Sequence, residues 1–169
     1  MLGPDKLMLE KVNNDNFDDF FNLIVELARF EHLDPPDNAG KARLREHALS
    51  NTPFYEAYIG RLGGRPIAYL IYFFTYSSFL AKPTLYLEDI FILEEQRGKG
   101  FGKELFLFCV QRAKDMGCGR VEWSALNWNE RAIRFYRSMG AEPLSEWTYF
   151  RLTEGAIESL LERNGRLTR

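Results

Sequence analysis

The spacing of apolar residues along the chain predicts five helices. Between residues 17 and 30, apolar side chains recur at steps of three and four, as on the buried face of an amphipathic helix. Asn14 and Asp15 stand just before this stretch and are suitable N-cap residues. Helical periodicity, capping residues and terminating glycines indicate four further helices, at residues 39–49, 100–116, 129–139 and 153–163.

Apolar or alternating segments around these helices predict six strands. Two of them are joined through Gly63-Gly64, a pattern typical of a hairpin. The six segments are residues 6–12, 55–62, 66–76, 85–93, 120–125 and 147–152. Their order among the helices predicts an α+β (mixed α/β) fold with a mixed sheet, in a single domain over residues 1–169.

Composition narrows the class of protein. The chain is 46% hydrophobic and 15% aromatic, which is enough apolar material for a packed globular core. Its 22 basic and 24 acidic residues leave a formal net charge of -2. This excludes the global cationic field that nonspecific nucleic-acid binding requires, so we expect no nucleic-acid partner and only a local anion site.

Neither a membrane segment nor a metal site is expected. The longest apolar run, Ile67–Phe74, is far shorter than the ~20 residues of a spanning helix, and the N-terminus has no run typical of a signal peptide. Cys109 and Cys118 are expected to be reduced, and neither histidine stands near a cysteine. These features favour a cytoplasmic enzyme or binding domain.

The glycine-rich stretch Gln96–Lys103 is the strongest candidate for chemistry. It lies between a predicted strand and a predicted helix, where glycines let backbone N–H groups approach an anion and the helix adds its positive end. Its spacing fits neither a Walker A loop nor the Gly-x-Gly-x-x-Gly pattern of dinucleotide folds. The alternative is a strand-to-helix turn with exposed basic residues.

Two motifs in this order resemble a known family. Arg97-Gly98-Lys99-Gly100-Phe101-Gly102 is similar to the Arg/Gln-x-x-Gly-x-Gly/Ala signature of the GCN5-related N-acetyltransferases, whose loop holds the pyrophosphate of acetyl-coenzyme A. The stretch from Asn127 through Tyr136 to Gly140 is similar to that family's Asn-x-x-Ala-x-x-Phe-Tyr helix. The resemblance implies a central mixed, mostly antiparallel sheet of about six to seven strands flanked by helices, and acetyl-coenzyme A as co-substrate without a metal.

Within the family, the chain looks most like the diamine acetyltransferases, which include the spermidine/spermine and thialysine enzymes. Residues 26–31, 72–76 and 85–92 carry this similarity. Ser77 and Phe79 stand where the polyamine enzymes have an acidic residue and a Trp, so spermidine itself is not carried over as the substrate.

The resemblance implies acetyl transfer to the primary amine of a small cationic acceptor, by direct attack on the thioester. A diamine, a polyamine or a lysine-like amino acid would serve as that acceptor. It also implies a homodimer. The alternatives are acetylation of a protein N-terminus or lysine, and a noncatalytic acyl-coenzyme A-binding module.

Tyr136 and Glu88 are the catalytic candidates. A phenol has a reference pKa of ~10, close enough to the ~8.5 of a departing thiol to supply its proton, and the resemblance places Tyr136 beside the thioester sulfur. By periodicity alone Tyr136 is a core aromatic. Glu88 and Asp89 are adjacent in an apolar strand and are expected to point to opposite faces of the sheet. By resemblance Glu88 holds the ammonium or takes its proton through water; the alternative is an exposed pair.

The remaining site residues rest on the resemblance alone. Backbone groups at Ile90, Phe91 and Ile92 would pair with the pantetheine arm, and Lys103, Asn129 and Ala132 would complete the coenzyme contacts. The acceptor site would include Phe30, Glu31, Glu122, Trp123 and Ser124. Read without the family, Asn129 is a helix cap, Phe30 continues a core stripe, and Glu31 is a solvated helix end.

Overall fold

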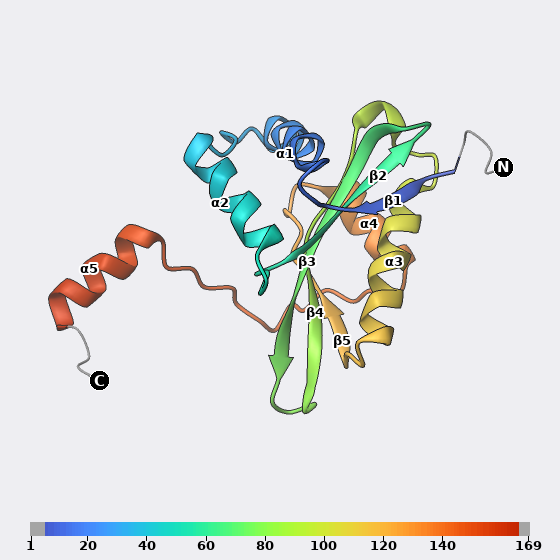
Figure 1. Cartoon of the computed structure of the whole chain (residues 1–169). Coiled ribbons are helices and arrows are strands. Elements are labelled where there is room, and N and C mark those ends of the chain that lie inside the picture. The colour runs from blue at the N-terminus through green and yellow to red at the C-terminus, as the bar shows by residue number, and fades with distance from the viewer. Residues whose placement is uncertain (1–5, 166–169) are drawn as a thin grey trace. The chain divides into compact units, whose positions relative to one another are not determined.

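The computed structural model describes residues 6–165 and divides into two compact units. The first ends at Ser124, and the second begins at Ala125. Figure 1 shows the first unit as a sheet with helices and the second as two helices joined by an extended segment.

One sheet forms the centre of the first unit. Over the described residues it has five strands in the order β1-β2-β3-β4-β5, fewer than the six to seven expected. Neighbours from β1 to β4 are antiparallel, and β5 runs parallel to β4. The strands are β1 (Met8–Lys11), β2 (Glu56–Leu62), β3 (Arg65–Ser77), β4 (Lys82–Ile92) and β5 (Arg120–Glu122).

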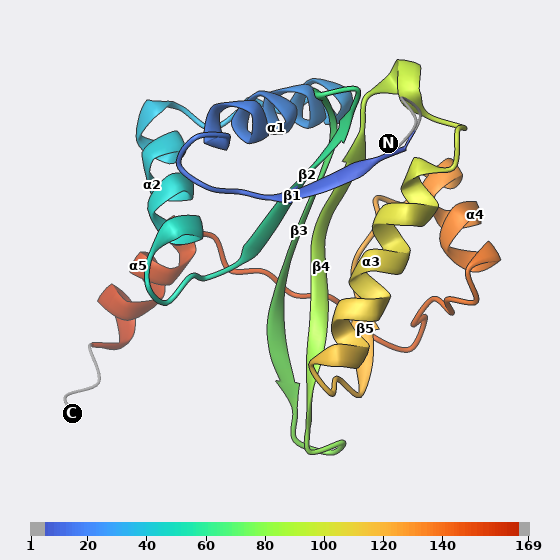
Figure 2. The same cartoon turned by 45° about the vertical axis from the view of Figure 1, so that its right-hand side comes forward.

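The helices of the first unit cover both faces of this sheet. They are α1 (Phe17–Glu31), α2 (Asn38–Leu49) and α3 (Phe101–Asp115), with a short 3-10 turn, η1 (Glu94–Gln96), before α3. Figure 2 shows α1 and α2 on one side of the strands and α3 on the other. The predicted helices at these positions are therefore confirmed to within one residue at most ends.

The main core lies between α1 and the sheet. The Phe20 ring meets the Tyr69 ring of β3 edge-on, with centroids 5.5 Å apart. Phe17 packs edge-on against Phe20 at 5.8 Å, and Ile59 and Ile71 of β2 and β3 belong to the same buried cluster. These residues alternate along their strands, so the other residues of β2 and β3 face α3.

Packing against α3 occupies the opposite face of the sheet. The Tyr58 ring of β2 lies edge-on to Phe108 of α3 at 4.7 Å. Arg112 of α3 donates from Nε to the Tyr72 hydroxyl at 3.1 Å and forms an ion pair with Glu56 at 3.1 Å. Cys109 is a fully buried free thiol on the same helix, and Cys118 is also free. The sheet therefore has two packed faces.

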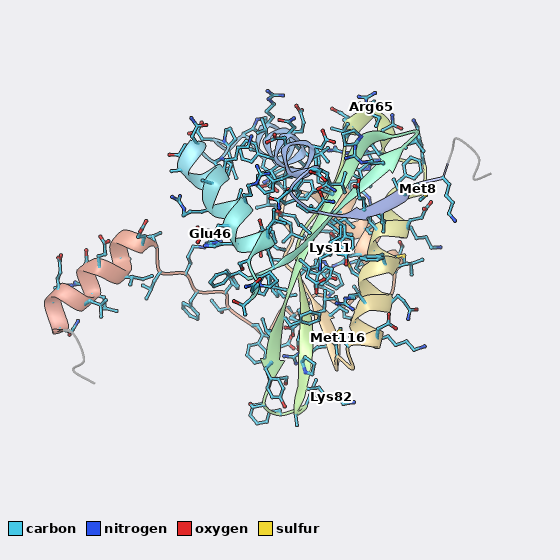
Figure 3. All side chains as sticks on the ribbon, in the orientation of Figure 1. Met8, Lys11, Glu46, Arg65, Lys82 and Met116 are labelled. Atoms are coloured by element: carbon cyan, nitrogen blue, oxygen red, sulfur yellow. The ribbon has the colours of Figure 1, made fainter. Side chains whose placement is uncertain are left out.

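β3 and β4 are longer than β2 and form a projecting hairpin. β2 pairs with β3 only as far as Tyr72, whereas β3 and β4 remain paired to Ser77 and Lys82. Figure 3 labels Arg65 and Lys82 at opposite ends of this hairpin. The fully exposed Phe79 lies in its turn.

The start of α1 differs from the prediction. The N-cap is Asn16, not Asn14 or Asp15, and its side chain makes no cap bond to the helix. Asn16 Oδ1 instead accepts from the Asn13 N–H at 2.8 Å, and its amide donates to the Lys11 carbonyl at 3.1 Å. The side chain is used to fold the turn after β1, which is why a local capping rule chose the wrong N-cap residue although the predicted helix start at residue 17 is confirmed.

The second unit contains two helices, α4 (Glu130–Ser138) and α5 (Glu154–Asn164), neither of which has a buried residue. Thr153 caps α5 as predicted, accepting from the Ala156 N–H at 3.4 Å. The predicted strand at residues 147–152 is wrong, because this segment is not assigned to any strand. Aromatic and apolar residues of the kind that strands favour do not by themselves supply the edge that a strand must pair with.

Candidate active site

The glycine-rich loop between β4 and α3 has the geometry of an anion cradle. Gly98 and Gly100 have φ of 81° and 93°, a region that residues with a Cβ rarely enter. Gly100 is the N-cap of α3, and a Cβ built on it would meet no atom within 4 Å. Open space thus lies in front of a helix end whose first N–H groups have no intrahelical partner.

Two lysines add positive charge to this loop. Lys99 and Lys103 are exposed, and Lys99 Nζ donates to Gln96 Oε1 at 2.8 Å. Phe101 is buried, so its side chain anchors α3 in the core and only its backbone is available to a ligand. Gly102 lies close to the end of β4, where an added Cβ would come within 3.3 Å of Ile92 Cδ1.

The side chain of Arg97 points inward, although Arg97 is the first residue of the motif that is expected to hold the pyrophosphate. Its Nε donates to the Ile92 carbonyl at 2.9 Å. The guanidinium carbon lies 4.4 Å from the centroid of the Phe30 ring and 5.5 Å from that of Phe91. Arg97 therefore joins the start of the loop to the end of β4 and to the end of α1.

The register of β4 breaks at Glu88. Ile71 pairs with Asp89 and Tyr72 pairs with Leu87, so Glu88 is an extra residue in β4 with no partner in β3. A bulge of this kind bends the strand and changes the direction of nearby side chains. Glu88 and Asp89 are expected to point to opposite faces because side chains alternate along a regular strand. The bulge interrupts that alternation at these two residues.

Past the bulge, one edge of β4 is not paired with a strand of the described chain. β5 pairs with β4 only at Thr84, Leu85 and Tyr86. Ile90, Phe91 and Ile92 therefore pair with β3 on one side only. Their backbone groups on the other side are geometrically suited to an extended ligand that pairs as a strand would.

Tyr69 contacts the carboxylate of Asp89, and the charges of Glu31 and Glu88 also act on this pair. The Tyr69 hydroxyl donates to Asp89 Oδ2 at 3.2 Å. Burial, followed by the charge of Asp89 and its hydrogen bond, raises the pKa of Tyr69 well above 10, and the charges of Glu31 and Glu88 act in the same direction. Burial raises the pKa of Asp89 to about 6, with the charge of Glu88 as the next cause and that of Glu31 a smaller one. Burial alone raises the pKa of Glu31.

Asp89 and Tyr69 are not among the site residues that the sequence predicts, because Tyr69 is one residue of an apolar strand and Asp89 enters only as the neighbour of Glu88 in another strand. The signal for Asp89 was its carboxylate inside an otherwise apolar run, beside Glu88. Nothing in the chain near Tyr69 indicates that its hydroxyl meets a residue 20 positions away. The Tyr69–Asp89 contact depends on strand register, which only the fold supplies.

The end of β5 brings together three other predicted acceptor residues. Glu122 forms an ion pair with Arg120 at 2.9 Å. The Trp123 ring lies edge-on to Phe106 of α3 at 5.3 Å, so it contributes to the packing of α3. Ser124 is exposed. Their role in binding an acceptor stays a prediction.

The second unit holds the three remaining candidates on α4. Asn129 is the N-cap, and its Oδ1 accepts from the Ala132 N–H at 3.2 Å, which confirms the capping interpretation. The amide nitrogen of Asn129 provides two further donors. Ala132, Tyr136 and Met139 are half-buried along one side of α4, whereas the arginines at 131, 134 and 137 are exposed.

Residues 6–165 contain no group of three His, Cys, Asp or Glu side chains placed to hold a metal ion. Over the same residues, every helix is too short or too polar to span a lipid bilayer.

Comparison with known proteins adds information that is independent of this geometry. The model of the acetyltransferase (GNAT) family matches residues 17–141. A thialysine N-epsilon-acetyltransferase from Bos taurus is 30% identical over 165 residues, which cover 91% of this chain and 96% of that protein. An L-ornithine N5-acetyltransferase from Arabidopsis thaliana is 45% identical over 96 residues, which cover 57% of this chain and 42% of the plant protein.

Solved structures share the fold over nearly the full chain. An integron cassette protein from V. cholerae matches with a TM-score of 0.80 at 22% identity, covering 92% of this chain and 98% of that one. An aminoglycoside N-acetyltransferase in complex with CoA matches with a TM-score of 0.71 at 18% identity, covering 90% and 98%. At these identities the likeness establishes the fold.

Proposed function

We propose, from the premise that this chain belongs to the acetyltransferase (GNAT) family and is an N-acetyltransferase, that it acetylates a small amine with two charged ends, such as ornithine or a lysine-like amino acid. Acetyl-coenzyme A would be the acetyl donor. The relatives named for thialysine and ornithine support this class of acceptor. The family membership favours an enzyme over a noncatalytic acyl-coenzyme A-binding module.

The observation that carries the proposal is the gathering of Glu31, Glu88 and Asp89 near the end of β4. Burial raises the pKa values of Glu31 and Asp89, and the neighbouring charges of Glu88 and Glu31 raise that of Asp89 further. An ammonium group bound among them would relieve this repulsion. The cluster therefore favours a cationic acceptor and disfavours an anionic one.

The residues at the start of α3 fit the pyrophosphate of the coenzyme. Gly98 and Gly100 shape the cradle, the open space in front of Gly100 admits an anion, and Lys99 and Lys103 offer opposite charge. The unpaired edge at Ile90–Ile92 supports main-chain pairing with the pantetheine arm. When bound, acetyl-coenzyme A supplies an activated acetyl thioester.

We assign the proton transfers to Glu88 and Tyr136. The acceptor must lose a proton from its ammonium before the nitrogen can attack, and Glu88, which is exposed in the bulge, can accept that proton through a water molecule. A backbone N–H past the bulge would stabilise the negative charge that develops on the carbonyl oxygen. Tyr136 would return a proton to the departing thiolate, so the products are the amide, the free thiol and one released proton.

Thiol release measured with a panel of acceptors tests the function. The panel contains L-ornithine, thialysine, L-lysine, putrescine, spermidine, L-glutamate and a lysine-containing peptide with a free N-terminus. We expect the diamino acids to be best and L-glutamate inactive. Preference for the peptide would favour acetylation of proteins, and absence of release with every amine would contradict the enzyme proposal.

Two variants then test the role of the carboxylate. Glu88→Gln should lower kcat/KM for the best amine by about tenfold or more, because it removes one charge and the proton acceptor. Asp115→Asn removes an exposed carboxylate at the far end of α3 and should leave kcat/KM within about twofold. Equal effects of the two changes would refute a specific role for Glu88.

We also propose that the protein is a homodimer in which residues 147–152 of each copy pair with a sheet edge of the other. Trp147, Tyr149 and Phe150 are 74%, 77% and 86% exposed. They lie in the extended segment between α4 and α5 (Figure 1), and aromatic side chains are favoured in strands. β5 is last in the strand order, so its outer edge can accept a strand from a second copy.

A further inference from the structure

Arg97 is the first residue of the coenzyme loop, yet its side chain contacts two other elements, β4 and α1. The Nε–H holds the carbonyl of Ile92, the last residue of β4, at 2.9 Å. The guanidinium carbon lies over the ring of Phe30, next to last in α1, at 4.4 Å from its centroid, and 5.5 Å from the ring centroid of Phe91 in β4. We call Phe30, Phe91 and Arg97 the aromatic clamp.

The clamp connects the two halves of the proposed site. Ile92 is among the residues proposed to pair with the coenzyme arm, and its Cδ1 is the atom that a Cβ added at Gly102 would meet, at 3.3 Å. Phe30 stands beside Glu31, one of the three carboxylates that would receive the acceptor. A single side chain therefore spans from the anion cradle to the acceptor side.

We infer that Arg97 is a positioning residue that couples acetyl-coenzyme A binding to acceptor binding through its contact with Phe30. The inference rests on the proposed function of the loop and of the carboxylate cluster. Ordering of residues 97–103 around the coenzyme fixes Arg97, and Arg97 in turn fixes the Phe30 ring beside the acceptor. By linkage, each ligand then strengthens the binding of the other by the same factor.

Arginine is the side chain that this role requires. Its planar guanidinium can stack on an aromatic face while its Nε–H donates in the plane, and the ammonium of lysine cannot do both in this way. Phe30, in turn, contributes the face of its ring. Its substitution by Tyr should therefore keep the clamp, and its substitution by Leu should remove it.

The chain provides a matched control on the same helix. Phe21 is also a partly buried ring of α1 that packs against the core, and Lys41 Nζ lies over it at 4.9 Å from the centroid. Phe21→Leu thus removes a similar ring and a similar cation contact, but the cation belongs to Lys41 of α2 and not to Arg97 of the loop. Any general effect of weakening α1 appears in both Leu variants.

Isothermal titration with acetyl-coenzyme A is the first measurement. Phe30→Leu should raise the Kd about five- to tenfold, whereas Phe30→Tyr and Phe21→Leu should stay within about twofold of the parent. In the Arg97→Lys background, Phe30→Leu should add less than about twofold, because the contact it removes is already broken. The acceptor KM should rise in parallel in Phe30→Leu.

Hydrogen exchange of the ligand-free protein gives a readout that does not depend on the proposed function. Amides of residues 97–103 should exchange several-fold faster in Phe30→Leu than in the parent or in Phe21→Leu. An unchanged exchange rate and an unchanged Kd in Phe30→Leu would overturn the inference, as would equal effects in the two Leu variants. Failure of the parent itself to bind acetyl-coenzyme A would instead refute the proposed function, while the exchange rates still report on the clamp.

Discussion

Asp89 is a buried acid whose environment opposes its charge. Its pKa is raised to about 6 in the folded protein, mainly by burial and next by the charge of Glu88, against ~3.9 for an unfolded chain. Between these values the folded state binds more protons than the unfolded state, so the free energy of unfolding falls as the pH rises through this range. Above pH 6 the full penalty of the ionised carboxylate is present.

Asp89→Asn removes this penalty and keeps an oxygen for the Tyr69 hydroxyl. We expect the variant to be more stable than the parent by about 1–3 kcal/mol at pH 8, with the gain shrinking to well under about 1 kcal/mol at pH 4. Urea unfolding at the two pH values measures the difference. A gain that is the same at both pH values would show that it comes from packing and not from the titration of Asp89.

Gly100 offers a second test at the residue scale, because Gly117 is a natural control. Both glycines have positive φ, 93° and 66°, and a Cβ on either would meet nothing within 4 Å. Substitution by Ala should therefore destabilise the protein by about 1–2 kcal/mol at each site. Only Gly100→Ala places a methyl group in the anion cradle, so it alone should weaken acetyl-coenzyme A binding, by about tenfold or more in isothermal titration. Equal affinity of the two variants for acetyl-coenzyme A would show that the loop is not part of the coenzyme site.

At the scale of elements, α4 shows how one residue can serve a helix and a ligand. Asn129 uses Oδ1 to cap the Ala132 N–H, which leaves its amide N–H groups for the coenzyme. Asn129→Ser keeps a capping oxygen and removes those donors. We expect unfolding stability to stay within about 0.5 kcal/mol while the Kd for acetyl-coenzyme A rises about three- to tenfold. An unchanged Kd would mean that Asn129 is a cap and nothing more.

The elements also show which information a sequence carries locally. α1 and α3 were predictable because their apolar residues follow a helical period and one face packs on the sheet. The hairpin of β2 and β3 was predictable from alternation around Gly63-Gly64. These elements are specified by spacing within about fifteen residues of chain.

Features that depend on a partner strand could not be predicted in the same way. The bulge at Glu88 exists only in the register between β3 and β4, and the inward position of Arg97 depends on where α1 ends relative to β4. The segment 147–152 has a strand pattern but no strand to pair with in its own chain over the described residues. The candidate site was therefore found through its motifs, while the Tyr69–Asp89 contact and the clamp required the fold.

At the scale of the whole molecule, the two units differ sharply in how well they are packed. The first has an aromatic core on one face of its sheet and α3 on the other. The second has no buried residue in either of its helices and a run of exposed aromatic side chains between them. Exposed apolar side chains gathered in one segment are typical of an interaction site, and the extended chain between α4 and α5 (Figure 1) favours pairing between strands.

A single charge in that segment should therefore change the oligomeric state. Tyr149→Glu places a carboxylate where the proposed dimer buries an aromatic ring, and we expect light scattering after size exclusion to report about 20 kDa instead of twice the chain mass of 19.7 kDa. Phe54→Glu alters a ring of the first unit that is similarly exposed, at 73%, and should leave the dimer intact.

Urea unfolding gives a second measurement of the same dimer. Because a monomer leaves the aromatic segment uncovered, Tyr149→Glu should unfold at a lower urea concentration than the parent. The urea midpoint of the parent should rise with protein concentration, while that of the variant should not. A monomeric parent with a concentration-independent midpoint would contradict the homodimer.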